Sequence, residues 1–134
     1  KEKFKQDSTK SFFLYDPLAF FDKDGIFTAD LALSLDVIYH LIEDEIYWKY
    51  LTDLFNSAKR FVVIYAWNLS HCDIELAPHI KPRRFTEDIE KHIQAWYLRD
   101  IIKNPYSIEE YGNKHGSYSN FYIYQNQSWY MLDY

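Results

Sequence analysis

The sequence predicts an α/β protein with an open, largely parallel sheet, helices on the faces of the sheet and an antiparallel strand near its C-terminal edge. Apolar runs of strand length alternate with segments of helical periodicity. Polar residues end these runs where a strand should give way to a loop. The chain has 134 residues, 48% hydrophobic and 26% charged, and a net charge of −5, which is typical of one globular unit or part of a larger one.

The first two expected strands both end on an acid. Residues 11–15, SFFLY, run into Asp16, and residues 29–35, ADLALSL, run into Asp36. A later apolar run ends at Asn68 in the same way. Because ligands of open α/β sheets lie outside the carboxyl ends of the strands, these three polar residues are candidates to line one ligand crevice.

A helix is expected over 44–59, where apolar residues recur with helical spacing. Residues 60–68, RFVVIYAWN, follow at once, and their unbroken apolar core predicts a strand that is covered on both faces. We expect this strand to be central, between 31–35 and 120–126. The helix should bury Tyr47, Leu51, Leu54 and Ala58 and turn Lys49, Asp53 and Asn56 toward water.

The C-terminal half continues the alternation. A polar loop over about 70–84 leads to an expected helix over 87–94, for which Thr86 is a candidate N-cap. Residues 96–102, WYLRDII, should form a strand. A tyrosine-rich loop then leads to a last strand over 120–126, NFYIYQN.

Composition excludes several classes of protein. No apolar run is long enough to cross a bilayer, and no signal-like core follows the polar N-terminus. The single Cys72 excludes an internal disulfide framework and predicts a reducing, cytoplasmic location. The acidic balance argues against nucleic acid as a partner. Aromatic residues reach 20%, whereas only 3 glycines are present, so the backbone has few places to approach a phosphate closely.

The ordered set of segments resembles class I S-adenosylmethionine-dependent methyltransferases. ADLALSLDVIYHLIEDE and the following RFVVIYAWN resemble the fourth strand, its helix and the fifth strand of that family. SFFLYDP resembles the third strand, and GSYSNFYIYQN resembles the terminal hairpin strand. The match covers roughly 10–126 and implies a partial Rossmann-like fold, with residues 1–134 as the C-terminal part of a methyltransferase domain.

The resemblance also implies a reaction and a sheet order. The reaction is transfer of a methyl group from S-adenosylmethionine to an oxygen or nitrogen of a small acceptor. In the complete fold the strands lie in the order third, second, first, fourth, fifth, seventh, sixth.

One element of the family is missing. The Gly-rich cofactor turn and the acid that holds the ribose are absent, because Gly25, Gly112 and Gly116 do not lie between an early strand and a helix. The strand at 29–35 would then have an exposed edge. We expect an N-terminal segment or a partner chain to cover this edge, and we expect the isolated chain to be inactive. The alternative is a non-catalytic interaction module derived from a truncated or degenerate methyltransferase fold.

The resemblance assigns cofactor contacts to Asp16 and Pro17, on the adenine side, and to Asp36 and Val37, at the methionine end. For Asp16-Pro17 the alternative is simple turn chemistry, and for Asp36 it is an acid at the entry of a helix. Tyr39 and His40 follow, where acceptor-facing residues of the family often lie. Histidine can take a proton from an attacking hydroxyl or amine, although a packed histidine is the alternative.

The loop after 60–68 supplies the candidate substrate-binding residues His79, Arg83 and Arg84. Arginine forks suit a phosphate or carboxylate on a substrate, and a solvated basic loop is the alternative. His71, Cys72, Asp73 and His79 match no closed zinc pattern, so no metal site is predicted. The tyrosines of the C-terminal loop are candidates for an acceptor pocket or for core and rim positions: Tyr106, Tyr111 and Tyr118.

Overall fold

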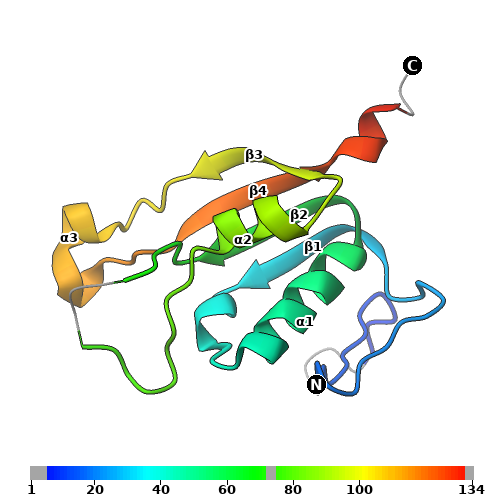
Figure 1. Cartoon of the computed structure of the whole chain (residues 1–134), viewed down its shortest axis with the longest axis horizontal. Helices are drawn as coiled ribbons and strands as arrows, with labels where there is room; N and C mark the ends of the chain where they lie inside the picture. Colours follow the sequence, from blue (N-terminus) through cyan, green and yellow to red (C-terminus); the bar gives the residue numbers. More distant parts are fainter. Residues whose placement is uncertain (1–5, 72–74, 132–134) are drawn as a thin grey trace.

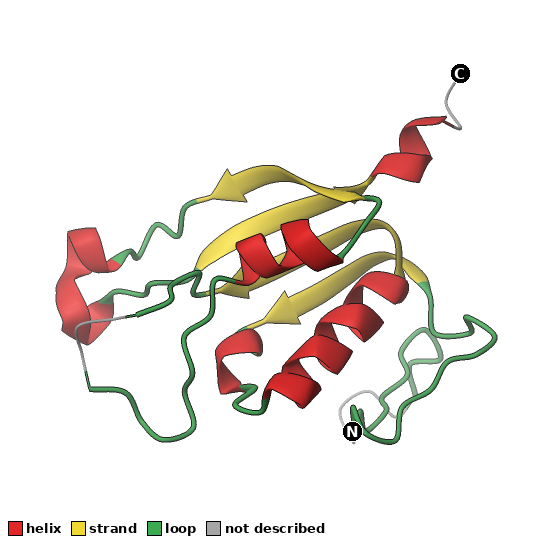
Figure 2. Ribbon diagram, in the orientation of Figure 1, coloured by secondary structure: helices red, strands yellow, loops and turns green. Residues whose placement is uncertain are grey.

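The computed structural model describes residues 6–71 and 75–131 and contains one mixed sheet with helices packed on it (Figures 1 and 2). The strands lie in the order β1-β2-β4-β3. β1 is parallel to β2, and β4 is antiparallel to both β2 and β3. The elements are β1 (Ala29–Leu35), η2 (Ile38–His40), α1 (Asp44–Asn56), β2 (Ala58–Ala66), α2 (Phe85–His92), β3 (Trp96–Ile102), α3 (Ile108–His115), β4 (Asn120–Asn126) and η3 (Gln127–Met131). The α/β class is confirmed, but the sheet is mixed rather than largely parallel.

β2 is a central strand, as predicted, with β1 on one side and β4 on the other. Val62, Ile64 and Ala66 are buried beneath the helices, and two ring contacts show that both helices use this face. Phe55 of α1 lies edge-on to Tyr124, with ring centroids 5.4 Å apart, and a residue of α2 packs against Tyr122 in the same manner.

The expectation that β2 is covered on both faces is wrong. Phe61, Val63 and Tyr65 alternate with the buried residues of this strand and stay partly exposed. The reason is that α1 and α2 lie on the same face of the sheet (Figure 2).

α1 confirms the predicted apolar stripe. Tyr47, Leu51 and Leu54 are buried, and so is Ala58, although the helix ends at Asn56 and Ala58 belongs to β2. Two predicted solvent positions differ from expectation, because the Lys49 ammonium donates to the Phe20 carbonyl oxygen and the Asp53 side chain is only 16% exposed. The N-terminal segment covers this side of the helix.

Residues 11–15 do not form the predicted strand. The Tyr15 hydroxyl donates to Asp53 Oδ2 at 2.7 Å and so ties the segment to α1, while Leu14 is 96% exposed. An aromatic run of strand composition forms a strand only where another strand offers backbone hydrogen bonds. No strand among residues 6–71 and 75–131 pairs with this segment, which therefore remains an irregular coil.

α2 and α3 differ from the sequence-based expectations. α2 begins at Phe85, and Thr86 lies inside the helix rather than at its N-cap. Asn68 binds this first turn instead: its Oδ1 accepts the Thr86 N–H at 3.2 Å, and its Nδ2 donates to the Thr86 hydroxyl at 2.7 Å. Part of the predicted tyrosine-rich loop is α3, which Gly112 interrupts with a φ of 68°.

Candidate functional site

The corner after β1 is built on a left-handed aspartate. Asp36 has a φ of 57°, a conformation that aspartate tolerates better than most residues. Its N–H donates to the Tyr65 carbonyl oxygen at 2.8 Å, and its Oδ1 accepts the Tyr39 hydroxyl at 2.8 Å. The carboxylate at the strand end thus binds a side chain of η2 and stabilises the turn into this short helix, for which Val37 is the N-cap.

Tyr39 joins this corner to the carboxyl end of β2. Its ring stacks on Trp67 with centroids 5.0 Å apart, and Tyr118 lies edge-on to Trp67 at 5.3 Å. Burial and then the hydrogen bond to Asp36 raise the pKa of the Tyr39 phenol. The phenol therefore stays protonated at neutral pH and acts as a donor, not as a base.

His40 is exposed, as is Asp36. Its Nδ1 lies 3.2 Å from the carbonyl oxygen of His79, and the two imidazole rings stack with centroids 5.6 Å apart. Because a carbonyl oxygen only accepts, this contact needs a proton on Nδ1, and the neutral ring then keeps its lone pair on Nε2. His40 is thereby set up to accept a proton at Nε2.

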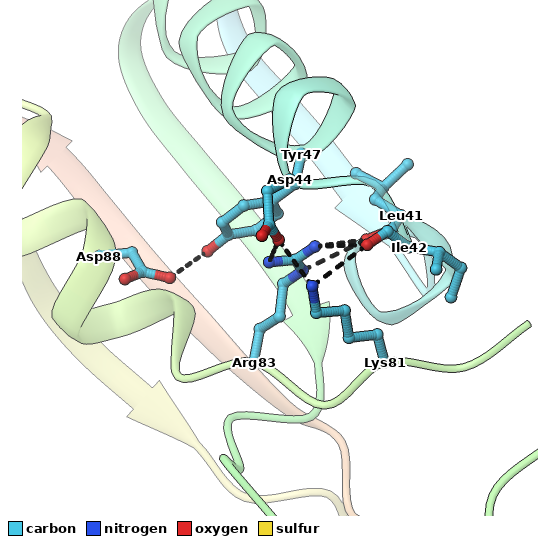
Figure 3. A network of polar contacts seen from close by, with 7 residues as sticks. All are labelled: Leu41, Ile42, Asp44, Tyr47, Lys81, Arg83 and Asp88. Atoms are coloured by element: carbon cyan, nitrogen blue, oxygen red, sulfur yellow. Dashed lines mark hydrogen bonds and ion pairs between the residues drawn. The ribbon is translucent and has the colours of Figure 1, made fainter.

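Arg83 binds the backbone that follows His40, at Leu41 and Ile42 (Figure 3). Its side chain is 9% exposed and its guanidinium lies 4.0 Å from the centre of the Tyr47 ring. Nε and Nη2 donate to the Leu41 carbonyl oxygen at 3.2 and 2.8 Å, and Nη2 also donates to the Ile42 carbonyl oxygen at 3.1 Å. Nη1 pairs with Asp44 at 2.8 Å.

Lys81 completes the network. Its ammonium pairs with Asp44 at 2.7 Å, and its backbone N–H donates to the Tyr39 carbonyl oxygen at 2.8 Å. The hydrogen bonds from Lys81 and then from Arg83 lower the pKa of Asp44. The loop after β2 thus fixes the position of the Tyr39-His40 corner.

The structure brings together Asp36, Val37, Tyr39, His40 and His79 from the predicted set. Arg83 lies beside them, but its donors bind the chain's own carbonyl and carboxylate oxygens, so a substrate contact by Arg83 stays a prediction. The neighbouring Arg84 is exposed and pairs with Glu87 at 2.9 Å.

Asp16 and Pro17 lie away from this corner. Asp16 Oδ1 accepts the Leu18 N–H at 3.0 Å, in a turn that also contains Pro17. The preceding residue, Tyr15, contacts Tyr50 and Asp53 of α1, whereas Asp36 leads into the opposite, N-terminal end of that helix. The cofactor role predicted for Asp16 and Pro17 stays untested.

The loop after β2 contains His71, Cys72, Asp73 and His79. Cys72 and Asp73 lie outside the described residues. Within the described part of the chain, no group of three or more His, Cys, Asp or Glu side chains could hold a metal ion.

The residues present fit S-adenosylmethionine incompletely. A Cβ at Gly116 would lie 2.5 Å from the Ile108 Cα, so this glycine admits the chain's own backbone rather than a ligand. Gly25 and Gly112 have φ values of 64° and 68° in a turn and in the kink of α3. Two clefts of about 660 and 480 Å³ lie elsewhere, between α2 and β3 and between the N-terminal segment and α1. Cofactor contacts by Asp36 and Val37 therefore stay a prediction.

Sequence reasoning missed the residues that support the corner from β2. Trp67 stacks on Tyr39, and the Tyr65 carbonyl oxygen accepts the Asp36 N–H at 2.8 Å. In the sequence both aromatic residues read as part of a buried strand. The position of Trp67 beside Asn68, at a strand carboxyl end, was the available signal.

Comparisons of the chain with protein-family models, with curated proteins and with solved structures found no match. Among the described residues, no helix has the length and apolar character needed to cross a membrane.

Proposed function

We propose that this chain is part of a methyltransferase-like domain that transfers a methyl group from S-adenosylmethionine to an oxygen or nitrogen of a small acceptor. The observation that carries the proposal is the strand order β1-β2-β4-β3, with the last strand inserted antiparallel between β2 and β3. The same order is expected for the fourth, fifth, seventh and sixth strands of the family that the sequence resembles. This insertion is a specific topological feature. Strands that follow one another in the sequence more often lie side by side, whereas here β4 separates β2 from β3.

The chain's own residues supply the acceptor side of the reaction. Tyr39, held by Asp36 and Trp67, presents a fixed aromatic wall. His40 Nε2 takes a proton from the acceptor hydroxyl or amine. Much of the rate of such a transfer comes from orientation of the reacting groups, so the rigidity of the corner matters as much as the base.

The proposal is tested by calorimetric titration with S-adenosylhomocysteine. Each hydrogen bond that the ribose fails to make forfeits roughly 1 kcal/mol, and several such losses lower affinity by orders of magnitude. The chain alone should therefore bind no better than millimolar and transfer no methyl group. Addition of a segment with a strand, a Gly-rich turn and a ribose-binding acid, in the same chain or as a separate chain, should bring the affinity into the micromolar range.

Two results would contradict this reasoning. Micromolar binding by the chain alone would mean that the cofactor site is built from other residues, with the Tyr39-His40 corner as the first place to look. Failure of the completed protein to bind would contradict the methyltransferase assignment itself.

A non-catalytic interaction module is the second candidate function, and one observation favours it. β1 is one of the two outer strands of the sheet, and its leucines at positions 31, 33 and 35 are about half exposed. An apolar outer strand of this kind is typical of a surface that binds another chain. Binding of a partner through β1 by the chain alone, together with failure of the completed protein to bind S-adenosylhomocysteine, would support the module.

A further inference from the structure

The two outer strands of the sheet differ in how they are protected. β3 carries Arg99 and Asp100 and has a register shift between Leu98 and Asp100, all features that discourage pairing at an edge. β1 also has a register shift, between Ala29 and Leu31, and carries Asp30 there, but it has no charged residue from 31 to 35, LALSL, and pairs regularly with β2 over this stretch. The structure therefore leaves residues 31–35 of this edge open to a further strand.

The open edge is also apolar on one face. Leu31, Leu33 and Leu35 are 47, 55 and 51% exposed, whereas Ser34, which points the other way, is buried and binds Tyr50 of α1. The partly exposed residues of β2 continue the apolar surface inward. The N-terminal segment comes near this edge, because its Tyr15 and Leu33 of β1 line the same apolar hollow of about 260 Å³. Leu33 nevertheless stays half exposed, so the segment does not cover the edge.

The charges beside β1 argue against a second copy of this chain at the open edge and favour an unlike partner chain. Acids stand at both ends of β1, with Asp30 near its start and Asp36 directly after its end. Antiparallel pairing of two copies over residues 31–35 places Leu33 opposite Leu33 and Asp30 opposite Asp36. Like charges directly opposite one another are destabilising, and the net charge of −5 adds to the repulsion.

We propose that the β1 edge docks a strand of an unlike protein chain, apolar at alternate residues and flanked by Lys or Arg at both ends. Backbone hydrogen bonds to the outward-directed groups of residues 31–35 supply the affinity, as in other cases of strand addition. The alternating apolar side chains of the partner cover Leu31, Leu33 and Leu35. The basic flanks meet Asp30 and Asp36.

Two synthetic peptides serve as probes, KRVTVTVKR and its acidic match EEVTVTVEE, both capped at their ends. Amide hydrogen exchange and chemical shifts of the isotope-labelled chain report where each peptide binds. The basic peptide should slow exchange at residues 31–35 and bind at least tenfold more tightly than the acidic one, with a difference that added salt reduces. Sedimentation of the free chain should show a monomer.

Leu33→Lys places a charge on the open edge and should abolish binding of the basic peptide. Ile102→Lys is the matched control, because Ile102 is 50% exposed on the opposite edge strand, and it should leave binding unchanged. The proposal fails if neither peptide affects β1, if both bind equally, if the shifts map to β3, or if the free chain dimerises in a way that Leu33→Lys prevents. None of these measurements involves S-adenosylhomocysteine, so their failure is distinct from failure of the proposed reaction.

Discussion

Replacement of Arg83 by Ala tests how the Tyr39-His40 corner is held in place. The change removes three hydrogen-bond contacts to the carbonyl oxygens of Leu41 and Ile42, the pair with Asp44 and the contact with the Tyr47 ring. A hydrogen bond to a charged group contributes about 1.5–3 kcal/mol, and a cation–π contact about 0.5–2 kcal/mol. These terms are not additive, and water can replace part of them at Asp44, whose side chain is exposed. We expect a loss of about 2–4 kcal/mol in the free energy of unfolding.

Urea unfolding followed by circular dichroism measures this loss. Arg84→Ala is the matched control, because its pair with Glu87 is exposed and should change the free energy of unfolding by less than about 1 kcal/mol. Arg83→Lys keeps the charge but not the planar fork, so it should recover less than half of the loss. A loss for Arg83→Ala no larger than that for Arg84→Ala would refute the view that this network fixes the corner.

Three further predictions concern Leu51 in the core, the acid Asp44 and the candidate base His40. Leu51→Ala should cost about 2–5 kcal/mol in urea unfolding, since Leu51 is fully buried, while a cost below about 0.5 kcal/mol, the range expected for the exposed Thr52→Ala, would contradict the packing. Because two cationic partners lower the pKa of Asp44, its contribution to stability is complete above the unfolded-state pKa of about 3.9 and is lost as the pH falls through the lower folded-state pKa. The difference in stability between the wild type and Asp44→Asn should thus shrink below about pH 4, and a constant difference down to acid unfolding would argue against it. In the completed protein, His40→Gln should lower kcat by about 10²–10⁴ without weakening S-adenosylhomocysteine binding, and an unchanged kcat would remove His40 as the base.

The periodicity of the sequence was sufficient to predict the elements that build the core. Helical spacing identified the buried face of α1, including Tyr47, Leu51 and Leu54, and the unbroken apolar run of β2 identified the central strand. These predictions succeed because the burial of apolar side chains depends on local spacing, which the chain carries in itself.

The same local reasoning failed where an element needs a distant partner. Residues 11–15 have strand composition but no strand beside them, and Tyr15 binds α1 instead. Asn68 was predicted to line a crevice at the end of a strand, yet its amide binds the first turn of α2. Composition states what a segment can form, whereas available hydrogen-bond partners decide what it does form.

The candidate site divides in the same way. The sequence by itself determined that an acid, a tyrosine and a histidine follow a predicted strand, at its carboxyl end. Only the tertiary structure decided that Tyr39 is held as a donor by Asp36 and Trp67, that His40 Nδ1 lies against the His79 carbonyl oxygen, and that Arg83 binds Leu41 and Ile42. The physical reason is that a titratable or charged group can make several kinds of contact. Asp36 lies three residues before Tyr39, but the other neighbours that select one of these contacts lie 28 to 42 residues away in the sequence.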